Sequence, residues 1–116
     1  SAVLTALVSS GLPTDKFLFL GYLPLKQKKR ELLFENLALL QRRIRVTLII
    51  FESPHRLIKT LGEIQEKFGD IDIVICRELT KVFEEIRREK ISSSLKHFEE
   101  TKPQGEFTLC LNLPPK

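Results

Sequence analysis

The sequence predicts an α/β domain in which helices flank a mixed sheet of about five strands. Stretches with the periodicity of an amphipathic helix alternate along the chain with short apolar runs of strand length. At 116 residues the chain can bury one hydrophobic core but not two, and no repeat, low-complexity tract or linker divides it. We therefore expect a single domain over residues 1–116.

The first half of the chain predicts two helices and two strands. Residues 2–10 are expected to form a short apolar helix, closed by the glycine and proline that follow, and 17–23 a strand. Between residues 28 and 43 apolar side chains recur at steps of three and four, which is typical of one helix face. Residues 46–51 are a continuous β-branched and apolar run, as expected for a strand covered on both faces.

The second half opens on the clearest predicted boundary. Ser53 is a natural N-cap and Pro54 suits the first helical position, so a helix is expected from there to residue 68. Gly69 can close this helix in the left-handed conformation. The remaining expected elements are a strand at 71–76, a polar edge strand at 84–91, a short helix at 93–101 and a strand at 106–113.

The composition is that of an ordinary folded domain, with 42% hydrophobic and 29% charged residues. No apolar run approaches the roughly 20 residues that cross a bilayer, and no signal peptide opens the sequence. Cys76 and Cys110 lie in strand-like runs, so we expect reduced core thiols and a cytoplasmic location. Two isolated cysteines without nearby histidines do not predict a metal site.

The net charge of +4 comes with clustered basic residues. A clustered basic surface suits a polyanionic partner, but a solvated helix face gives the same pattern, and charge alone leaves both interpretations open. The three basic blocks are Lys26, Lys28, Lys29 and Arg30; then Arg42, Arg43 and Arg45; and finally Arg87, Arg88 and Lys90.

Charged residues also gather where the predicted strands end, which is where open α/β sheets bind ligands. His55 and Arg56 would fall in the first turn of a helix, where the macrodipole disfavours cations by ~0.3–1 kcal/mol. Either a bound anion or the carboxylate of Glu52 would offset this unfavourable interaction. The second group, Arg77 to Lys81, could equally be a capped turn with an internal ion pair, and His97 is expected to be an ordinary surface residue.

Several classes of chemistry are excluded for this chain alone. Its five glycines are scattered, so no phosphate-binding loop of the P-loop or dinucleotide type is present. No serine sits in a nucleophile elbow, and no histidine, cysteine and aspartate set has metal spacing. The chain by itself is not a complete enzyme of any class defined by such motifs.

Several segments nevertheless occur together in a familiar order. In that order and spacing the chain resembles the ribosomal small-subunit RNA (cytidine-2′-O)-methyltransferase I group of the tetrapyrrole (corrin/porphyrin) methylase superfamily. It departs from the group at Tyr22, where phenylalanine is usual, and at Glu89-Lys90, where glycine is usual. The matching segments are Ser10-Gly11-Leu12-Pro13, Phe17-Leu18-Phe19, Gly21-Tyr22-Leu23-Pro24, Arg30, Glu52-Ser53-Pro54-His55-Arg56, Arg77-Glu78-Leu79-Thr80-Lys81, Glu84-Glu85 and Gly105-Glu106.

The resemblance implies a two-domain enzyme with S-adenosylmethionine in the cleft between the domains. Its glycine-rich motif belongs to the first domain, and Ser1-Ala2 looks like the tail of the segment that opens the second. Residues 1–116 are therefore expected to be the carboxyl-terminal domain, with the amino-terminal cofactor domain absent and the isolated fragment inactive. The resemblance also implies a tendency to form homodimers.

The implied reaction is methyl transfer to the ribose 2′-hydroxyl of a cytidine in small-subunit ribosomal RNA. Two other functions stay open, a stand-alone RNA-binding α/β module and half of a tetrapyrrole methyltransferase. Glu52, Glu78 and Lys81 are expected to orient the 2′-hydroxyl or to act as its general base. Phosphate binding is expected from Lys26, Lys28, Lys29, Arg30, His55, Arg56 and Arg77. Cofactor contacts are expected from Ala6, Gly21, Tyr22, Leu23, Pro24, Gly105 and Glu106.

Overall fold

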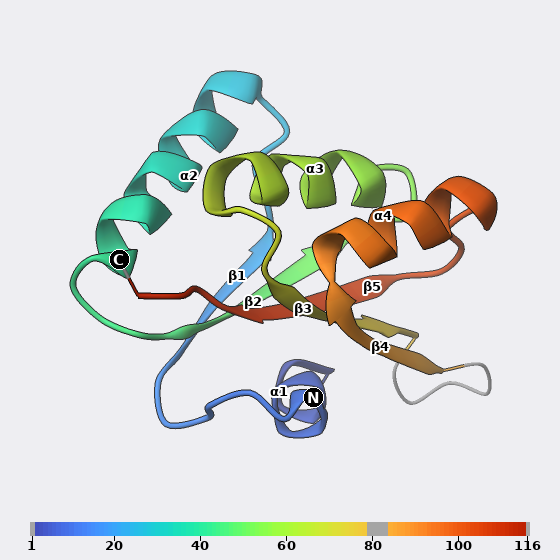
Figure 1. Cartoon of the computed structure of the whole chain (residues 1–116), viewed down its shortest axis with the longest axis horizontal. Coiled ribbons are helices and arrows are strands. Elements are labelled where there is room, and N and C mark those ends of the chain that lie inside the picture. The colour runs from blue at the N-terminus through green and yellow to red at the C-terminus, as the bar shows by residue number, and fades with distance from the viewer. Residues whose placement is uncertain (1, 79–83, 116) are drawn as a thin grey trace.

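The computed structural model describes residues 2–78 and 84–115 and confirms the predicted α/β class (Figure 1). Helices and strands alternate through most of the chain, as the sequence periodicity indicates. None of the helices in these two ranges is long and apolar enough to span a membrane. The elements are α1 (Ala2–Ser10), β1 (Phe17–Tyr22), α2 (Gln27–Gln41), β2 (Thr47–Glu52), α3 (Leu57–Phe68), β3 (Asp72–Arg77), β4 (Glu85–Lys90), α4 (Ile91–Glu100) and β5 (Phe107–Asn112).

The five strands form one mixed sheet in the order β1-β2-β5-β3-β4. β1 pairs with β2 in parallel, whereas β5 lies between β2 and β3 and is antiparallel to both. β1, β2 and β3 therefore run in one direction, and their carboxyl ends share one edge of the sheet. Across β5, Glu52 and Arg77 are both paired with Phe107, so the ends of β2 and β3 lie one strand apart.

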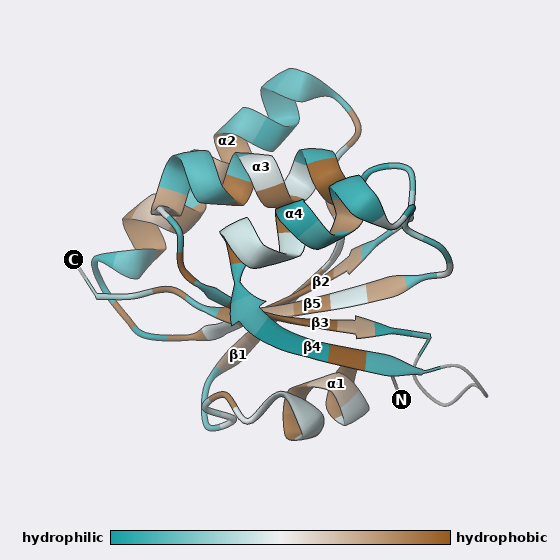
Figure 2. Cartoon of the chain, turned by 45° about the vertical axis from the view of Figure 1, so that its right-hand side comes forward, coloured by the Kyte–Doolittle hydropathy of each residue, from teal (hydrophilic) through white to brown (hydrophobic). Residues whose placement is uncertain are grey.

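Helices cover the sheet on both faces, but unequally. α2, α3 and α4 lie on one face and α1 alone lies on the other (Figure 1). Successive residues of β2 divide between the two layers, with Leu48 and Ile50 in the larger core and Ile49 in the smaller core beneath α1. This confirms that β2 is covered on both sides. Figure 2 shows that β4, at the sheet edge, is mostly hydrophilic, as predicted.

The start of α3 differs from its prediction. The helix begins at Leu57, and residues 53–56 instead form a tight turn in which the Arg56 N–H donates to the Ser53 carbonyl at 3.2 Å. The Glu52 carboxylate accepts the Ser53 N–H at 2.9 Å, so the donor at the strand end is satisfied before any helix begins. Ser53 is therefore not the N-cap; that position is held by Arg56, without a side-chain cap.

The end of α3 also differs in detail. Gly69 has a φ of 90° but a ψ of −177°, which is an extended glycine conformation rather than the left-handed helical one. Its N–H still donates to the Gln65 carbonyl at 2.8 Å, so it terminates the helix as expected.

Candidate active site at the sheet edge

The two segments predicted to contact a cofactor meet at the carboxyl ends of the strands. Tyr22 is the last residue of β1, and Glu106 directly precedes β5. The Tyr22 hydroxyl donates to Glu106 Oε2 at 3.4 Å, although 84 positions separate the two residues. Both side chains are exposed. We call the residues Tyr22, Glu78, Gly105 and Glu106 the rim.

Glu78 is held against the glycine of the rim by an unusual backbone. Its φ of 46° makes it a non-glycine residue in the left-handed region, which costs about 1–2 kcal/mol. Its N–H donates to the Glu106 carbonyl at 2.9 Å, which ties the end of β3 to the loop before β5. A Cβ placed on Gly105 would lie 2.5 Å from Glu78 Oε1, so only glycine leaves room for that carboxylate. Strain of this kind persists where the surroundings fix it, and it clusters at functional sites.

An exposed aromatic cluster adjoins Tyr22. Phe51 contacts Phe19 and Tyr22 edge to face, with ring centroids 5.1 and 5.6 Å apart. Phe19 is 45% exposed and Tyr22 59% exposed, so apolar rings stand open to solvent at the rim. Burial first, and then the neighbouring Glu106 carboxylate, raise the pKa of Tyr22, so its hydroxyl keeps its proton and remains a donor.

A β-bulge places these rings together. Phe19 pairs with Ile49 and Tyr22 with Phe51, so the register shifts by one residue between them. Without this extra residue Phe19 and Tyr22 would point to opposite faces of the sheet. Sequence reasoning missed Phe19 and Phe51 as site residues. The available signal was Gly21, a glycine inside a strand pattern, which has a φ of 64°.

Glu52 and Arg30, for which ligand contacts were predicted, are both buried. Glu52 is 2% exposed, and its Oε2 accepts the Thr60 hydroxyl at 2.6 Å. Arg30 is fully buried, donates to Thr60 Oγ1 and to the Pro24 carbonyl, each at 3.0 Å, and forms an ion pair with Glu63. These residues form one buried network that joins the ends of β1 and β2 to α2 and α3. Arg30 therefore cannot reach an RNA phosphate, and Glu52 cannot reach a ribose hydroxyl, in this structure.

Two of the predicted cofactor contacts are also buried. Ala6 is fully buried in the core beneath α1, and Leu23 is 5% exposed within the larger core. Pro24 is partly buried and contributes its carbonyl to Arg30. Ala6 and Leu23 are thus core residues, and Pro24 is bound to the buried Arg30.

The other predicted phosphate contacts divide into exposed and partly buried groups. Lys26, Lys28, Lys29 and His55 are exposed at the starts of α2 and α3, which follow the carboxyl ends of β1 and β2. Arg56 and Arg77 are partly buried. The Nη2 atom of Arg56 is buried without a hydrogen-bond partner. Lys81 lies outside the described residues.

Contacts within the domain engage the third basic block and one residue of the second. Arg87 pairs with Glu89 at 2.8 Å and Lys90 with Asp72 at 3.2 Å, while Arg88 donates to the Ser9 carbonyl. Arg45 donates to Asn112 at 2.6 Å. These contacts make the third block a set of structural bonds rather than a free cationic surface.

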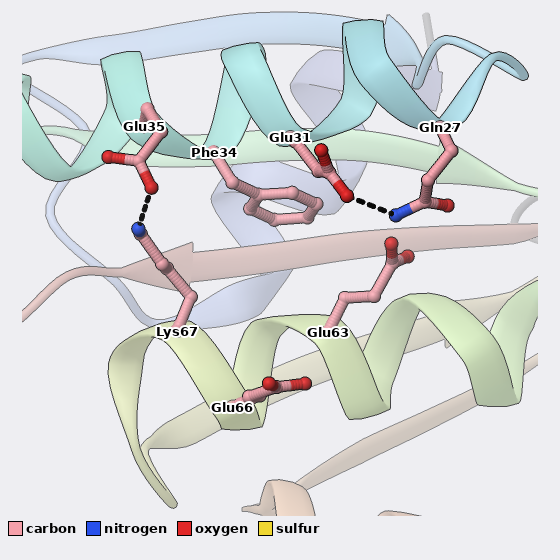
Figure 3. Close-up of a pocket in the computed structure, with 7 residues that line it drawn as sticks. All are labelled: Gln27, Glu31, Phe34, Glu35, Glu63, Glu66 and Lys67. Carbon is pink, nitrogen blue, oxygen red and sulfur yellow. Dashed lines mark hydrogen bonds and ion pairs between the residues drawn. The ribbon is translucent and has the colours of Figure 1, made fainter.

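An acidic groove lies between α2 and α3, away from the rim. It encloses about 320 Å³ beside the edge of Phe34, and Figure 3 shows carboxylates projecting into it from both helices. A negative lining repels polyanions, so the groove does not suit the phosphate contacts predicted from the sequence. No group of three or more metal-ligating residues occurs in 2–78 and 84–115. The carboxylates of the groove are those of Glu31, Glu35, Glu63 and Glu66.

The chain is similar over nearly its whole length to methyltransferases of known name. It is 43% identical over 112 residues to the ribosomal RNA small subunit methyltransferase I of Thermotoga maritima, covering 97% of this chain and 48% of that protein. It is 39% identical to the proteins of that name from Synechocystis sp. and Erythrobacter litoralis, of which it covers 39% and 40%. The chain thus spans about half the length, or somewhat less, of the curated relatives it matches. These matches confirm the resemblance inferred from the motifs.

Comparison of structures supports the fold. The crystal structure of the methyltransferase CobJ matches 97% of this chain and 48% of its own, with a TM-score of 0.64 and 19% sequence identity. At that identity the likeness shows a shared fold and nothing about the substrate. No family model matches the chain.

Proposed function

We propose that this chain is one half of an S-adenosylmethionine-dependent methyltransferase that acts on the ribose 2′-hydroxyl of a cytidine in small-subunit ribosomal RNA. The observation that carries this proposal is the 43% identity, across nearly the whole chain, to a protein named for small-subunit ribosomal RNA methylation. The rim supports it, because it joins the matching Gly21-Tyr22 and Gly105-Glu106 segments at the strand edge where α/β proteins bind ligands.

The rim residues fit the adenosine part of S-adenosylmethionine. The exposed ring of Tyr22 offers an aromatic surface for a purine, and the Glu106 carboxylate can accept hydrogen bonds from ribose hydroxyls. Gly21 in β1 and Gly105 before β5 both have positive φ and carry no side chain that would obstruct a ligand. When bound, S-adenosylmethionine supplies a methyl group on a positively charged sulfur. The chain has no glycine-rich loop, so the other part of the cofactor site would come from the missing half.

Glu78 is the described residue best placed to orient the target hydroxyl or accept its proton. Its carboxylate is partly buried at the rim and is fixed by its own backbone and by Gly105. Lys81 remains a second candidate, and Glu52 instead positions the strand end from within the network around Thr60. Holding the ribose oxygen in line with the methyl group is the main contribution that such residues can make.

The cations around the edge would hold the RNA backbone. Lys26, Lys28, Lys29 and His55 are exposed, and none of the four is tied to a carboxylate by an ion pair within the described ranges. Phosphate contacts of this kind position a nucleic acid without reading its sequence. We place the complete enzyme in the cytoplasm, with small-subunit ribosomal RNA or the 30S subunit as its partner, and a homodimer stays a prediction.

The proposal is tested by comparing the 116-residue chain with the complete protein. Radiolabelled S-adenosylmethionine and unmethylated 30S subunits are supplied, and mapping of 2′-O-methyl groups locates the product. We expect the complete protein to methylate a cytidine ribose and the isolated chain to be inactive. Methylation by the chain alone at the rate of the complete protein would contradict the half-enzyme proposal, and methylation of a precorrin instead of 30S would contradict the RNA assignment.

A matched pair of variants tests the rim in the complete protein. Glu106→Gln should raise the KM for S-adenosylmethionine by roughly 10-fold, because a carboxylate acceptor becomes a weaker amide acceptor. Glu99→Gln makes the same change at an exposed position of α4 and should leave that KM unaltered. Equal kinetics for the two variants would remove Glu106 from the cofactor site.

A further inference from the structure

A second concave site lies beneath α4, beside the rim and on the face of the sheet that carries α2, α3 and α4. It encloses about 290 Å³, with the buried ring of Phe98 among its lining residues. Its polar lining comes from four segments, namely the end of β3, the start of β4, the last turn of α4 and the loop that leads into β5. The polar lining residues are Arg77, Glu85, His97, Thr101, Lys102 and Gln104. We call this the α4 pocket.

The α4 pocket carries an excess of positive charge. Arg77 and Lys102 each bring a formal positive charge, and Glu85 is the one carboxylate among its lining residues. Neither the side chain of Arg77 nor that of Lys102 forms an ion pair or donates a hydrogen bond to any residue within 2–78 and 84–115. Glu85 therefore offsets only part of the positive charge of the pocket.

Arg77 resembles Arg56, which is also partly buried without an ion pair, and differs from Arg30 and Arg87. Arg30 and Arg87 are buried or partly buried, and both are bound to carboxylates. Arg77 is partly buried but has no such partner, although Glu85 faces it across the β3–β4 ladder. A guanidinium that is partly desolvated and unpaired gains strongly from an anion that can accept two of its donors.

The position of the pocket at the carboxyl end of α4 explains only part of its positive charge. Cations near a helix carboxyl terminus are favoured by the macrodipole, which accounts for His97 and Lys102 without any ligand. Arg77 comes from β3 and lies outside that explanation. The Thr101 hydroxyl and the Gln104 amide add neutral donors on the same lining, which is the mixture that phosphate oxygens require.

We infer that the α4 pocket binds a phosphate of the RNA backbone, next to the site of methyl transfer. The inference rests on the proposed function and adds a specific contact to it. Arg77 and Glu78 are adjacent in the chain, and Arg77 pairs with Phe107, the neighbour of Glu106. An RNA strand whose ribose lies at the rim therefore passes close to the mouth of the pocket, so that a flanking phosphate can enter it.

The inference is tested by binding of a short fluorescein-labelled single-stranded RNA to the chain, followed by anisotropy at several KCl concentrations. Arg77→Gln and Lys102→Gln should each weaken binding by about 5- to 10-fold and reduce the salt slope by about 0.7. The control is Lys96→Gln, which removes the same charge from an exposed position of α4 outside the pocket. The control should change the affinity by less than about 2-fold and leave the slope nearly unaltered.

Failure of the pocket and failure of the proposed function give different results. If the wild-type chain binds RNA and the pocket variants behave like Lys96→Gln, the pocket assignment is wrong while the function stands. If the complete protein does not methylate 30S subunits, the function itself fails.

A second measurement covers the case in which Arg77→Gln does not fold. The chain has two histidines, so the imidazole NMR signals of His97 can be followed during titration with RNA and with inorganic phosphate. A saturable shift with RNA that Lys102→Gln abolishes supports the inference. A shift with inorganic phosphate but none with RNA would show a free-anion site and overturn it.

Discussion

Replacing Arg30 by methionine tests whether this arginine stabilises the fold or binds an RNA phosphate. Methionine has a similar length and fills the space flexibly, so the change removes the charge and its hydrogen bonds more than the packing. Breaking a buried ion pair costs about 3–5 kcal/mol when the partner stays behind. The Glu63 side chain is 19% exposed and can recruit water, which places the expected loss near the lower value, about 3 kcal/mol.

This loss is large for a domain of this size, whose total stability is about 5–15 kcal/mol. Urea unfolding followed by circular dichroism measures it, and at a slope of about 2 kcal/mol per M the midpoint should fall by about 1.5 M. Lys28→Met is the matched control, because Lys28 lies two residues earlier in α2 and is exposed; its midpoint should hardly move.

An unchanged urea midpoint combined with weaker RNA binding would refute the structural role of Arg30. If Arg30→Met unfolded at the same urea concentration as Lys28→Met but weakened RNA binding, Arg30 would be a phosphate contact and the buried network would be wrong. A double-mutant cycle with Glu63→Gln adds a second check, since residues in direct contact should show a coupling energy of roughly 1–3 kcal/mol.

The other predictions concern the rim and the thiols. Gly105→Ala should lower the free energy of unfolding by about 1–2 kcal/mol, because φ is 86° and the new Cβ would meet Glu78; an unchanged urea midpoint would contradict this. Glu78→Gly relieves the left-handed strain, so stability should be unchanged or higher by up to about 1 kcal/mol while methyl transfer by the complete protein falls; loss of both stability and activity would argue against stored strain. Burial raises the pKa of Cys76 to about 11 and that of Cys110 to about 12, so iodoacetamide at pH 8 should label both thiols only in urea. Because the unfolded thiols ionise near pH 9 and the folded ones keep their protons, stability should fall as the pH rises above about 9; a flat stability profile from pH 8 to 10.5 would be inconsistent with this.

The existence and type of the elements could be predicted because each follows from local periodicity. The order of the strands could not. β5 comes last in the chain yet lies between β2 and β3. Its continuous apolar run does not indicate which strands it pairs with. Yet this position of β5 is what brings Glu106 to Tyr22 and to Glu78. The sequence indicated that these segments belong to one site only through the resemblance.

The buried face of α2 shows how a charge pattern can mislead. The expected apolar stripe was Leu33, Leu37, Leu40 and Ile44, but the buried positions of the helix are Arg30, Phe34, Leu37 and Gln41. These four residues also recur at helical spacing, so the correct face was visible only if an arginine was allowed inside it. A buried arginine needs partners from other elements, here Thr60 and Glu63 of α3, and such partners cannot be read from α2 alone.

The acidic groove between α2 and α3 gives the domain a lopsided charge distribution. Gln27, Glu31 and Glu35 line the groove at intervals of four residues, whereas Lys29 lies on the opposite side of the same helix. A polyanion that drifts toward the protein is therefore repelled along one flank and attracted along another, before any specific bond has formed. The charges of a single helix can thus orient an approaching polyanion. Added salt should weaken this long-range effect more than it weakens the short-range contacts of the bound state.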